Sequence, residues 1–124
     1  MAGVVTPSKR KNILVVENDE GIRESVAEVL TLEGYTVALA SNGQEGLNQL
    51  AQAPLPCLIL VDVLMPVMDG REFLARLKAD PALQGCKVAI FTAREMPPPQ
   101  GTVGLLRKPF ELSELLDLVN RHCP

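Results

Sequence analysis

The hydrophobic residues of this chain fall into short apolar runs that alternate with segments of helical periodicity. Five short, largely apolar runs are predicted to be strands. They are residues 12–16, 36–40, 57–61, 87–91 and 102–106. Apolar residues recur at helical spacing in four longer segments, residues 21–32, 43–52, 71–78 and 111–121. The last helix is predicted to turn Leu112, Leu115, Leu116 and Val119 inward. Strands joined by helices predict an α/β fold with a parallel sheet and helices on both of its faces.

The stretch from Cys57 to Gly70 contains the strongest sign of chemistry. Residues 57–61 are all apolar, as in a strand buried on both faces of a sheet, and Asp62 follows them directly. A carboxylate at that position is delivered to the carboxyl edge of the sheet, where open α/β folds bind ligands. The alternative is that Asp62 only caps a turn. Asp69 is better placed to cap the helix that follows, which leaves Asp62 free.

Polar residues follow the ends of three further predicted strands. They are Glu17, Asn18 and Asp19 after the first, Thr92 after the fourth and Lys108 after the fifth. Crowded carboxylates favour a bound cation, and oxygen ligands favour a hard ion such as Mg²⁺. A carboxylate beside Mg²⁺ can attack a phosphoryl group, and a lysine and a hydroxyl can stabilise the transferred charge. The pattern therefore predicts formation of an aspartyl phosphate.

Length, charge and composition restrict the number of domains, the class of partner and the expected location of the protein. A chain of 124 residues fits one domain, predicted over residues 12–124, with residues 1–11 as a loose N-terminal arm. The net charge of −3 gives the domain no attraction to nucleic acid, and the cluster at residues 9–11 is read as a solvated entry to the first strand. No run is long enough to cross a bilayer and no signal peptide is evident, so a cytoplasmic protein without a membrane partner is expected.

The cysteines give one further expectation. Cys57, Cys86 and Cys123 form no CxxC pair and leave an odd count, a pattern that suits a reducing compartment. Cys57 is expected in the core. The lone His122 is read as a solvated residue in the last turn of the final helix.

Four motifs in order resemble the receiver domain of bacterial two-component response regulators, over nearly the whole chain from Asn12 to Arg121. The motifs are Ile13-Leu14-Val15-Val16-Glu17-Asn18, the run from Leu60 to Gly70 with its Met65-Pro66 and Asp69-Gly70, Phe91-Thr92-Ala93, and Lys108-Pro109-Phe110. The resemblance implies a flavodoxin-like doubly wound sheet of five parallel strands in the order 2-1-3-4-5. It also implies a phosphoprotein that is not a turnover enzyme on an external substrate.

The resemblance also implies roles for individual residues. Asp62 would be phosphorylated by a histidine kinase or phosphotransfer protein, and would catalyse its own phosphorylation and dephosphorylation. Glu17, Asn18, Asp62 and the backbone carbonyl of Leu64 would hold Mg²⁺ or Mn²⁺. Thr92, the backbone of Ala93 and Lys108 would bind the phosphoryl group. The Lys108-Pro109 peptide bond is expected to be cis, as it often is in this family.

Three departures from the family pattern affect function. Asn18 stands where a second acidic residue is usual, so weaker Mg²⁺ binding is expected, with Asp19 as a possible accessory acid. Nine residues, 94–102, separate Ala93 from the core of the last predicted strand, and they include Pro97-Pro98-Pro99, so the family's fourth helix is expected to be missing or reduced to a turn. Leu105 occupies the position of the switch aromatic.

Two functions from different classes follow. The first is a phosphorylatable receiver that switches the binding of an unidentified partner. The second is a receiver-like interaction module that is not regulated by phosphorylation, which Asn18 and the lost helix would favour. A flavodoxin is disfavoured because the acidic loop after the first strand would repel a phosphate. The absence of GxGxxG and GxxxxGK[ST] sequences leaves dinucleotide and Walker-type sites unsupported.

Overall fold

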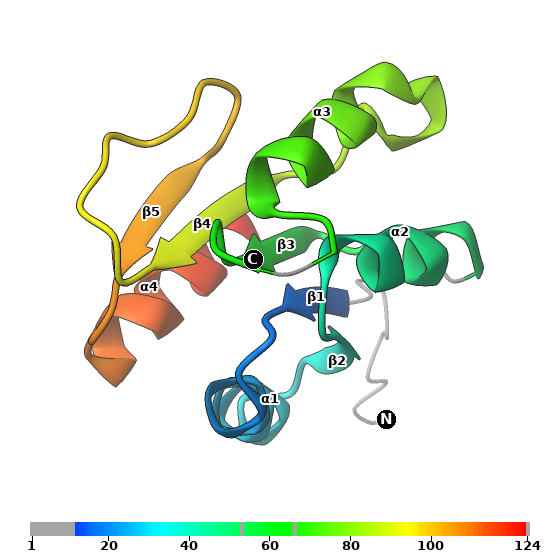
Figure 1. Cartoon of the computed structure of the whole chain (residues 1–124). Coiled ribbons are helices and arrows are strands. Elements are labelled where there is room, and N and C mark those ends of the chain that lie inside the picture. The colour runs from blue at the N-terminus through cyan, green and yellow to red at the C-terminus, as the bar shows by residue number, and fades with distance from the viewer. Residues whose placement is uncertain (1–11, 53, 66, 124) are drawn as a thin grey trace, which may run out of the picture.

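The computed structural model describes residues 12–52, 54–65 and 67–123 and contains a five-stranded parallel sheet in the order β2-β1-β3-β4-β5 (Figure 1). The strands are β1 Asn12–Val16, β2 Thr36–Ala40, β3 Leu58–Val61, β4 Val88–Thr92 and β5 Gly104–Arg107. The helices are α1 Glu20–Leu32, α2 Gly43–Gln52, α3 Gly70–Ala79 and α4 Leu112–His122, with a 3-10 turn at Pro81–Leu83. The predicted fold class and strand order are confirmed. The expected arm, the basic cluster at residues 9–11 and Pro66 lie outside the described residues.

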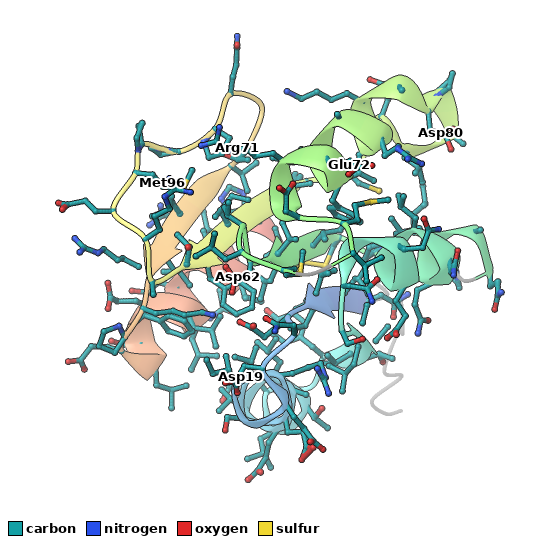
Figure 2. All side chains as sticks on the ribbon, in the orientation of Figure 1. Asp19, Asp62, Arg71, Glu72, Asp80 and Met96 are labelled. Atoms are coloured by element: carbon teal, nitrogen blue, oxygen red, sulfur yellow. A yellow bond between two sulfur atoms is a disulfide. The ribbon has the colours of Figure 1, made fainter. Side chains whose placement is uncertain are left out.

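Helices cover both faces of the sheet, as the alternation of strands and helices predicts. Figure 1 shows α1 and α4 on one face and α2 and α3 on the other. Each face has its own apolar core, one formed with Val26, Leu30, Leu115 and Val119, the other with Leu50, Phe73, Leu74 and Leu77. All four residues of β3 are buried because the strand lies between the two cores. Asp62 follows this strand and reaches the carboxyl edge of the sheet (Figure 2).

Local signals set most helix ends. Asp69 is the N-cap of α3, where its Oδ1 accepts a hydrogen bond from the backbone N–H of Glu72 at 2.9 Å, as predicted. Asp19 caps α1 in the same way, with its Oδ1 2.9 Å from the Ile22 nitrogen. Gly34, with φ of 95°, follows the end of α1. The inward orientation predicted for Leu112 is wrong: it is the first residue of α4 and 52% exposed, because the helix turns its buried stripe to the sheet only from Leu115 onward.

The described chain has no helix between β4 and β5, as expected from its three consecutive prolines. Proline has no N–H to donate, and it disfavours helical backbone at the residue before it. Figure 1 draws the segment in yellow as a loop that leaves the carboxyl end of β4 and returns to the start of β5 near α3. Met96 is partly buried and packs against the core on the α3 face.

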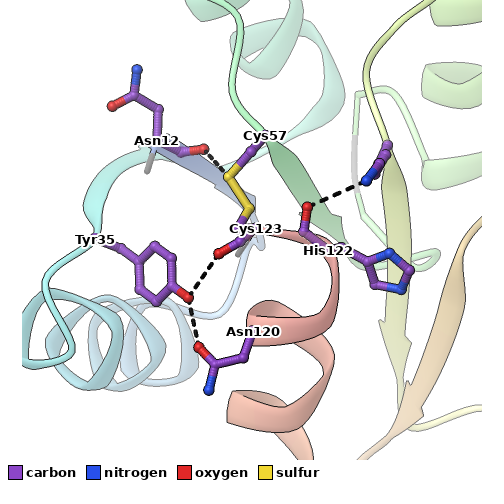
Figure 3. Close-up of a disulfide and its surroundings, with 7 residues drawn as sticks. Asn12, Tyr35, Cys57, Asn120, His122 and Cys123 are labelled. Atoms are coloured by element: carbon purple, nitrogen blue, oxygen red, sulfur yellow. Dashed lines mark hydrogen bonds between the residues drawn. A yellow bond between two sulfur atoms is a disulfide. The ribbon is translucent and has the colours of Figure 1, made fainter. Parts of the chain in front are cut away.

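Cys57 is partly buried and packs against the core, but the expectation that the cysteines stay unpaired is wrong. Cys57 and Cys123 form a disulfide across 66 residues, with a Cα–Cα distance of 5.6 Å, and only Cys86 is free among the described cysteines (Figure 3). The bond joins the start of β3 to the residue after α4. Sequence spacing could not reveal the pair, because the two cysteines meet only when α4 packs across the sheet. The cysteine pattern therefore gives no support for a reducing compartment.

Hydrogen bonds around the disulfide hold the same corner of the fold. The Tyr35 hydroxyl donates to Asn120 Oδ1 at 2.7 Å, and it lies 3.3 Å from the backbone oxygen of Cys123 (Figure 3). Burial, with a further contribution from Glu33, raises the pKa of Tyr35, so this hydroxyl remains a donor at neutral pH. This corner lies at the amino end of β3, away from Asp62.

Within the described residues no helix is long and apolar enough to span a membrane.

Candidate functional site

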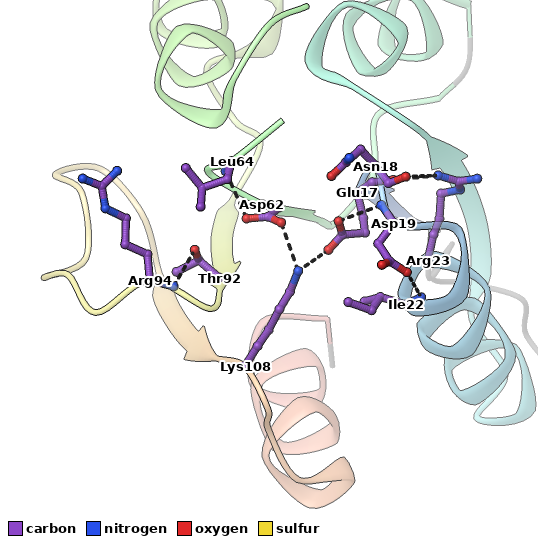
Figure 4. A network of polar contacts seen from close by, with 10 residues as sticks. All are labelled: Glu17, Asn18, Asp19, Ile22, Arg23, Asp62, Leu64, Thr92, Arg94 and Lys108. Atoms are coloured by element: carbon purple, nitrogen blue, oxygen red, sulfur yellow. Dashed lines mark hydrogen bonds and ion pairs between the residues drawn. The ribbon is translucent and has the colours of Figure 1, made fainter. Parts of the chain in front are cut away.

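An ammonium group and two carboxylates meet at the carboxyl edge of the sheet. Lys108, just after β5, places its Nζ 3.0 Å from Asp62 Oδ2 and also donates to Glu17 Oε1 (Figure 4). These residues are separated by 46 and 91 positions in the sequence and meet because parallel strands end at one edge. The structure thus brings together three of the predicted site residues.

This cluster is buried, which strengthens its electrostatic interactions. Glu17 is 1% exposed, Asp62 is 6% exposed and the Lys108 side chain is 14% exposed. Burial acts to lower the pKa of Lys108, but hydrogen bonds and Coulomb attraction from Glu17 and Asp62 outweigh it and raise the pKa above its ordinary value of 10.5. Lys108 therefore stays charged at neutral pH and neutralises part of the charge of the two acids.

The acidic loop after β1 is held by contacts that the sequence pattern does not reveal. The Glu17 Oε2 atom accepts a hydrogen bond from the Asp19 backbone at 3.0 Å. The Arg23 guanidinium donates to the backbone oxygens of Glu17 at 2.8 Å and Asn18 at 3.4 Å. Sequence reasoning missed Arg23, whose only signal is its place one turn into α1. Asn18 itself is exposed, and Asp19 uses one carboxylate oxygen as the α1 N-cap.

The loop that follows Asp62 orients its carboxylate. The backbone N–H of Leu64 donates to Asp62 Oδ1 at 3.1 Å, which leaves Oδ2 facing Lys108. The Leu64 side chain is exposed. Val67 has a φ of 67°, a left-handed conformation that a β-branched residue rarely adopts. The loop is therefore held in an unfavourable backbone conformation beside the acceptor candidate, as is common at functional sites.

Thr92 lies at the same edge, as the last residue of β4. Its side chain is fully buried, and its hydroxyl accepts a hydrogen bond from the backbone N–H of Arg94 at 3.1 Å. Figure 4 shows Thr92 beside Asp62 and Leu64, with Lys108 on the other side of the carboxylate. The peptide bond between Lys108 and Pro109 is cis, as expected.

An apolar groove with a volume of about 760 Å³ leads away from this cluster between α1 and the start of α4. Lys108 and Asp19 lie at its polar end. Ile22, Val26 and Phe110 are among the residues along its walls, and so is the exposed Leu112. The groove therefore joins the charged edge of the sheet to an apolar surface.

The sequence model of the response regulator receiver domain matches residues 13–120. The chain belongs to this family. Receiver domains are signalling domains rather than enzymes that act on an external substrate. The cluster of Glu17, Asp62, Thr92 and Lys108 described above lies within the matched residues.

Full-length relatives of this receiver are larger proteins. It is 37% identical over 114 residues to the probable transcriptional regulator ycf29 of Pyropia yezoensis, covering 87% of this chain and 51% of that protein. It is 36% identical over 115 residues to the response regulator Rre1 of Synechocystis, covering 87% of this chain and 49% of that protein. The chain thus spans about half the length of these relatives.

Solved receiver structures share the fold. The response regulator TrrA from Thermotoga maritima, in complex with Mg²⁺ and BeF, is 28% identical with a TM-score of 0.79, and the match covers 90% of this chain and 97% of that one. The chemotaxis protein CheY4 of Vibrio cholerae is 29% identical with a TM-score of 0.81, over 90% and 97% of the two chains. The receiver fold is therefore kept although a helix is missing between β4 and β5.

The donor atoms at this receiver site suit a hard cation. Glu17 and Asp62 provide carboxylate oxygens, and Asn18 follows Glu17 on the same loop. The described residues contain no group of three acidic, histidine or cysteine side chains placed to hold a metal ion. The set is oxygen-only, which fits Mg²⁺ or Mn²⁺ rather than a soft metal. It has one carboxylate fewer than the family pattern, because residue 18 is an asparagine.

Replacing Gly70 by alanine is expected to disturb the receiver site through the backbone. A Cβ at this position would lie 2.7 Å from the backbone oxygen of Asp62 and 2.8 Å from the Cα of Val63. Backbone atoms cannot rotate away, so the variant should lose about 2 kcal/mol of unfolding free energy in urea denaturation. Gly85→Ala is the matched control, because no heavy atom lies within 4 Å of its added Cβ. Equal stability of the two variants would contradict this account of the loop.

Proposed function

We propose that this chain is a phosphoacceptor domain of a two-component system, phosphorylated on Asp62 and switching the binding of a protein partner. The observation that carries the proposal is the buried Asp62 carboxylate held between Lys108 and the Leu64 backbone, with Glu17 beside it. A structural ion pair would need one acid. A second buried carboxylate against the same lysine is typical of a functional site, here one that would also take up a metal cation and a phosphoryl group.

The residues support transfer of a phosphoryl group to Asp62. An oxygen of the Asp62 carboxylate forms a bond to phosphorus, and the bond from phosphorus to the donor nitrogen or oxygen breaks. The transferred group carries negative charge on its remaining oxygens, so it requires donors and cations around it. In the proposal, Lys108 pairs with one oxygen, the Thr92 hydroxyl donates to another and the Ala93 backbone N–H supports the same charge. Attack by water on the acyl phosphate returns the free carboxylate.

Glu17, Asn18, Asp62 and the backbone carbonyl of Leu64 would hold Mg²⁺ or Mn²⁺. The ion would neutralise charge on the phosphoryl oxygens during transfer. In the structure Lys108 contacts Asp62 Oδ2 and Glu17 Oε1, so its ammonium group would share these two carboxylates with the cation. Asp19 would act as an accessory acid only by giving up its cap hydrogen bond to Ile22.

Replacing Asn18 by aspartate is expected to tighten Mg²⁺ binding on the order of tenfold, because it adds a formal negative charge next to the metal. Isothermal titration with MgCl₂ measures the affinity directly. Asn48→Asp, an exposed asparagine on α2, controls for the change in net charge. Unchanged affinity in the Asn18 variant would remove residue 18 from the proposed metal ligands.

A histidine kinase or phosphotransfer protein is the proposed phosphodonor. The apolar groove between α1 and α4 supports this, because it opens beside Lys108 and could seat a donor helix whose phosphohistidine must reach Asp62. The net charge of −3 favours a protein over a nucleic acid as the partner of this domain. In this proposal the domain works in the cytoplasm with its kinase and has no membrane partner.

Intact-protein mass spectrometry tests the proposal. Incubation with acetyl phosphate and MgCl₂ should add the mass of one phosphoryl group, and the gain should disappear when EDTA replaces MgCl₂. The second candidate function, an interaction module that is not phosphorylated, is favoured by Asn18. A folded protein that gains no mass would support this second function and reject the first.

Phosphorylation is expected to loosen the segment 94–102. The Thr92 hydroxyl accepts a hydrogen bond from the Arg94 N–H, and donating its proton to a phosphoryl group on Asp62 would draw the hydroxyl toward Asp62 and weaken the bond to Arg94. Leu105, which stands at the switch position, is half-buried on β5 and has no hydroxyl or ring with which to transmit the change. Amide exchange with and without beryllofluoride should show altered protection of Arg94 and its neighbours, while the buried amides of β3 stay protected. Unchanged protection of this segment would contradict the coupling.

A further inference from the structure

Three consecutive prolines between β4 and β5 restrict the local backbone to the polyproline II region. Pro97, Pro98 and Pro99 have φ fixed near −65°, and Met96, Pro97 and Pro98 are each restricted to extended ψ because a proline follows them. The cis peptide bond recorded among the described residues is that of Lys108-Pro109, so these three proline bonds are trans. Residues 97 and 98 satisfy both constraints and define the left-handed polyproline geometry.

Both ends of this segment are fastened to the body of the domain. On the amino side Met96 packs against the core and Glu95 pairs with Arg107 of β5 at 3.3 Å. On the carboxyl side the Lys78 ammonium of α3 donates to the backbone oxygen of Gln100 at 2.9 Å. The Thr102 hydroxyl also donates to the Pro99 oxygen at 2.7 Å. These contacts tie the segment to β5 and α3 on both sides of the prolines, which lowers the entropy that a partner would lose in ordering it.

The exposed face of this segment combines apolar rings with a positive charge. Pro97 and Pro98 are exposed between the half-buried Met96 and Pro99. Arg94 is also exposed, and no acidic side chain of the described residues forms an ion pair with it. It lies three residues before Pro97. Figure 2 shows this segment, with Met96 labelled, standing at the outer edge of the molecule.

We propose that residues 94–100 are a recognition element for a protein domain with an aromatic-lined groove and a neighbouring carboxylate, of the SH3 or WW class. Prolines in a preformed polyproline II helix pack into such grooves, and the carboxylate would pair with Arg94. The proposal concerns a surface distinct from the groove at α1 and does not require phosphorylation of Asp62.

Titration of the isotope-labelled whole chain with a panel of purified SH3 and WW domains, followed by NMR, tests the proposal. Saturable binding of at least one domain is expected, with the largest shifts at the Arg94, Glu95, Met96 and Gln100 amides. The double variant Pro97→Ala/Pro98→Ala should bind that domain about tenfold more weakly, and Arg94→Glu should weaken it at least as much. Circular dichroism of each variant checks that the fold is kept.

Matched controls separate specific recognition from a general effect of sequence change. Pro54→Ala removes an exposed proline in the connection from α2 to β3, and Arg121→Glu reverses an exposed charge in the last turn of α4. Both should bind like the unaltered chain. The proposal is overturned if no domain of the panel binds at concentrations up to about 1 mM, a Kd at the weak limit of specific recognition. It is equally overturned if the shifts lie elsewhere or if the control variants lose as much affinity as the test variants.

Discussion

Asp62→Asn is expected to abolish the mass gain that acetyl phosphate and MgCl₂ produce in the unaltered chain. An amide nitrogen is no nucleophile toward phosphorus, and the substitution leaves the oxygen that faces the Leu64 N–H available to hold the loop. The loss should be complete on the time scale in which the unaltered protein is fully labelled. Intact-mass measurement followed by peptide mapping locates any residual label.

The matched control for this experiment is Asp69→Asn, seven positions along the same loop motif. Asp69 caps α3 through its Oδ1, and asparagine caps a helix about as well as aspartate, so stability should be unchanged. Its carboxylate is not near Lys108 in the described network, so labelling should persist in this variant. Retained labelling of Asp62→Asn would overturn the assignment of the acceptor, and lost labelling of Asp69→Asn would show that the loop, rather than one carboxylate, is required.

Lys108→Met is expected to lower the free energy of unfolding by about 3 kcal/mol at neutral pH, since it leaves two buried carboxylates facing each other without their cation. Methionine keeps the length and most of the apolar stem of lysine. Urea denaturation with EDTA present measures the change without interference from metal ions. Phosphorylation from acetyl phosphate should slow strongly as well, because the transferred charge loses its ammonium partner.

The effect of Lys108 on stability has a defined dependence on pH. Its pKa is raised in the folded protein, so its stabilising contribution is complete below the ordinary value of 10.5 and is lost as the pH rises through the raised pKa. The difference between the unaltered chain and Lys108→Met should therefore be full at neutral pH and shrink in strongly alkaline solution. Lys87→Met, an exposed lysine near the end of α4, should change stability little at any pH. A Lys108 variant as stable as the Lys87 control would show that the ion pairs contribute no net stability.

The double variant Asp62→Asn/Lys108→Met distinguishes mutual repulsion from lost packing. If repulsion between Glu17 and Asp62 causes the loss of stability, removing one carboxylate should restore part of it, and the two changes should not be additive. Additive losses would instead indicate that the lysine stem contributes through packing alone. Because all three side chains share one network, the coupling should exceed about 1 kcal/mol.

Sequence reasoning located the regular elements because their signals are local. Buried strands read as continuous apolar runs, so β1 and β2 match their predicted ranges and β3 differs by one residue. Strand β5 begins at Gly104 rather than 102, because a turn that bonds Thr102 back to Pro99 delays its start. The signal for the absence of a helix before β5 is equally local, since three consecutive prolines forbid helical hydrogen bonds wherever they occur.

Contacts between distant positions could not be predicted in the same way. Arg23 as the anchor of the acidic loop and the joining of Cys57 to Cys123 are both consequences of packing. The same holds for Leu112, whose apolar character predicted burial although it stands at the edge of a groove. The type of a residue indicates which contacts it can make, and its neighbours in the folded chain decide which of these contacts form.

The sequence by itself determined the α/β alternation, the edge of the sheet at which the acids, the hydroxyl and the lysine gather, and the absence of a helix after Thr92. These follow from chain direction and backbone chemistry, which act within a few residues. Only the tertiary structure decided that Lys108 bridges Glu17 and Asp62, that Asp19 is engaged in capping α1, and that the last helix is tied to β3 by a disulfide. Those outcomes depend on distances between residues far apart in the chain, which are set when the helices pack on the sheet.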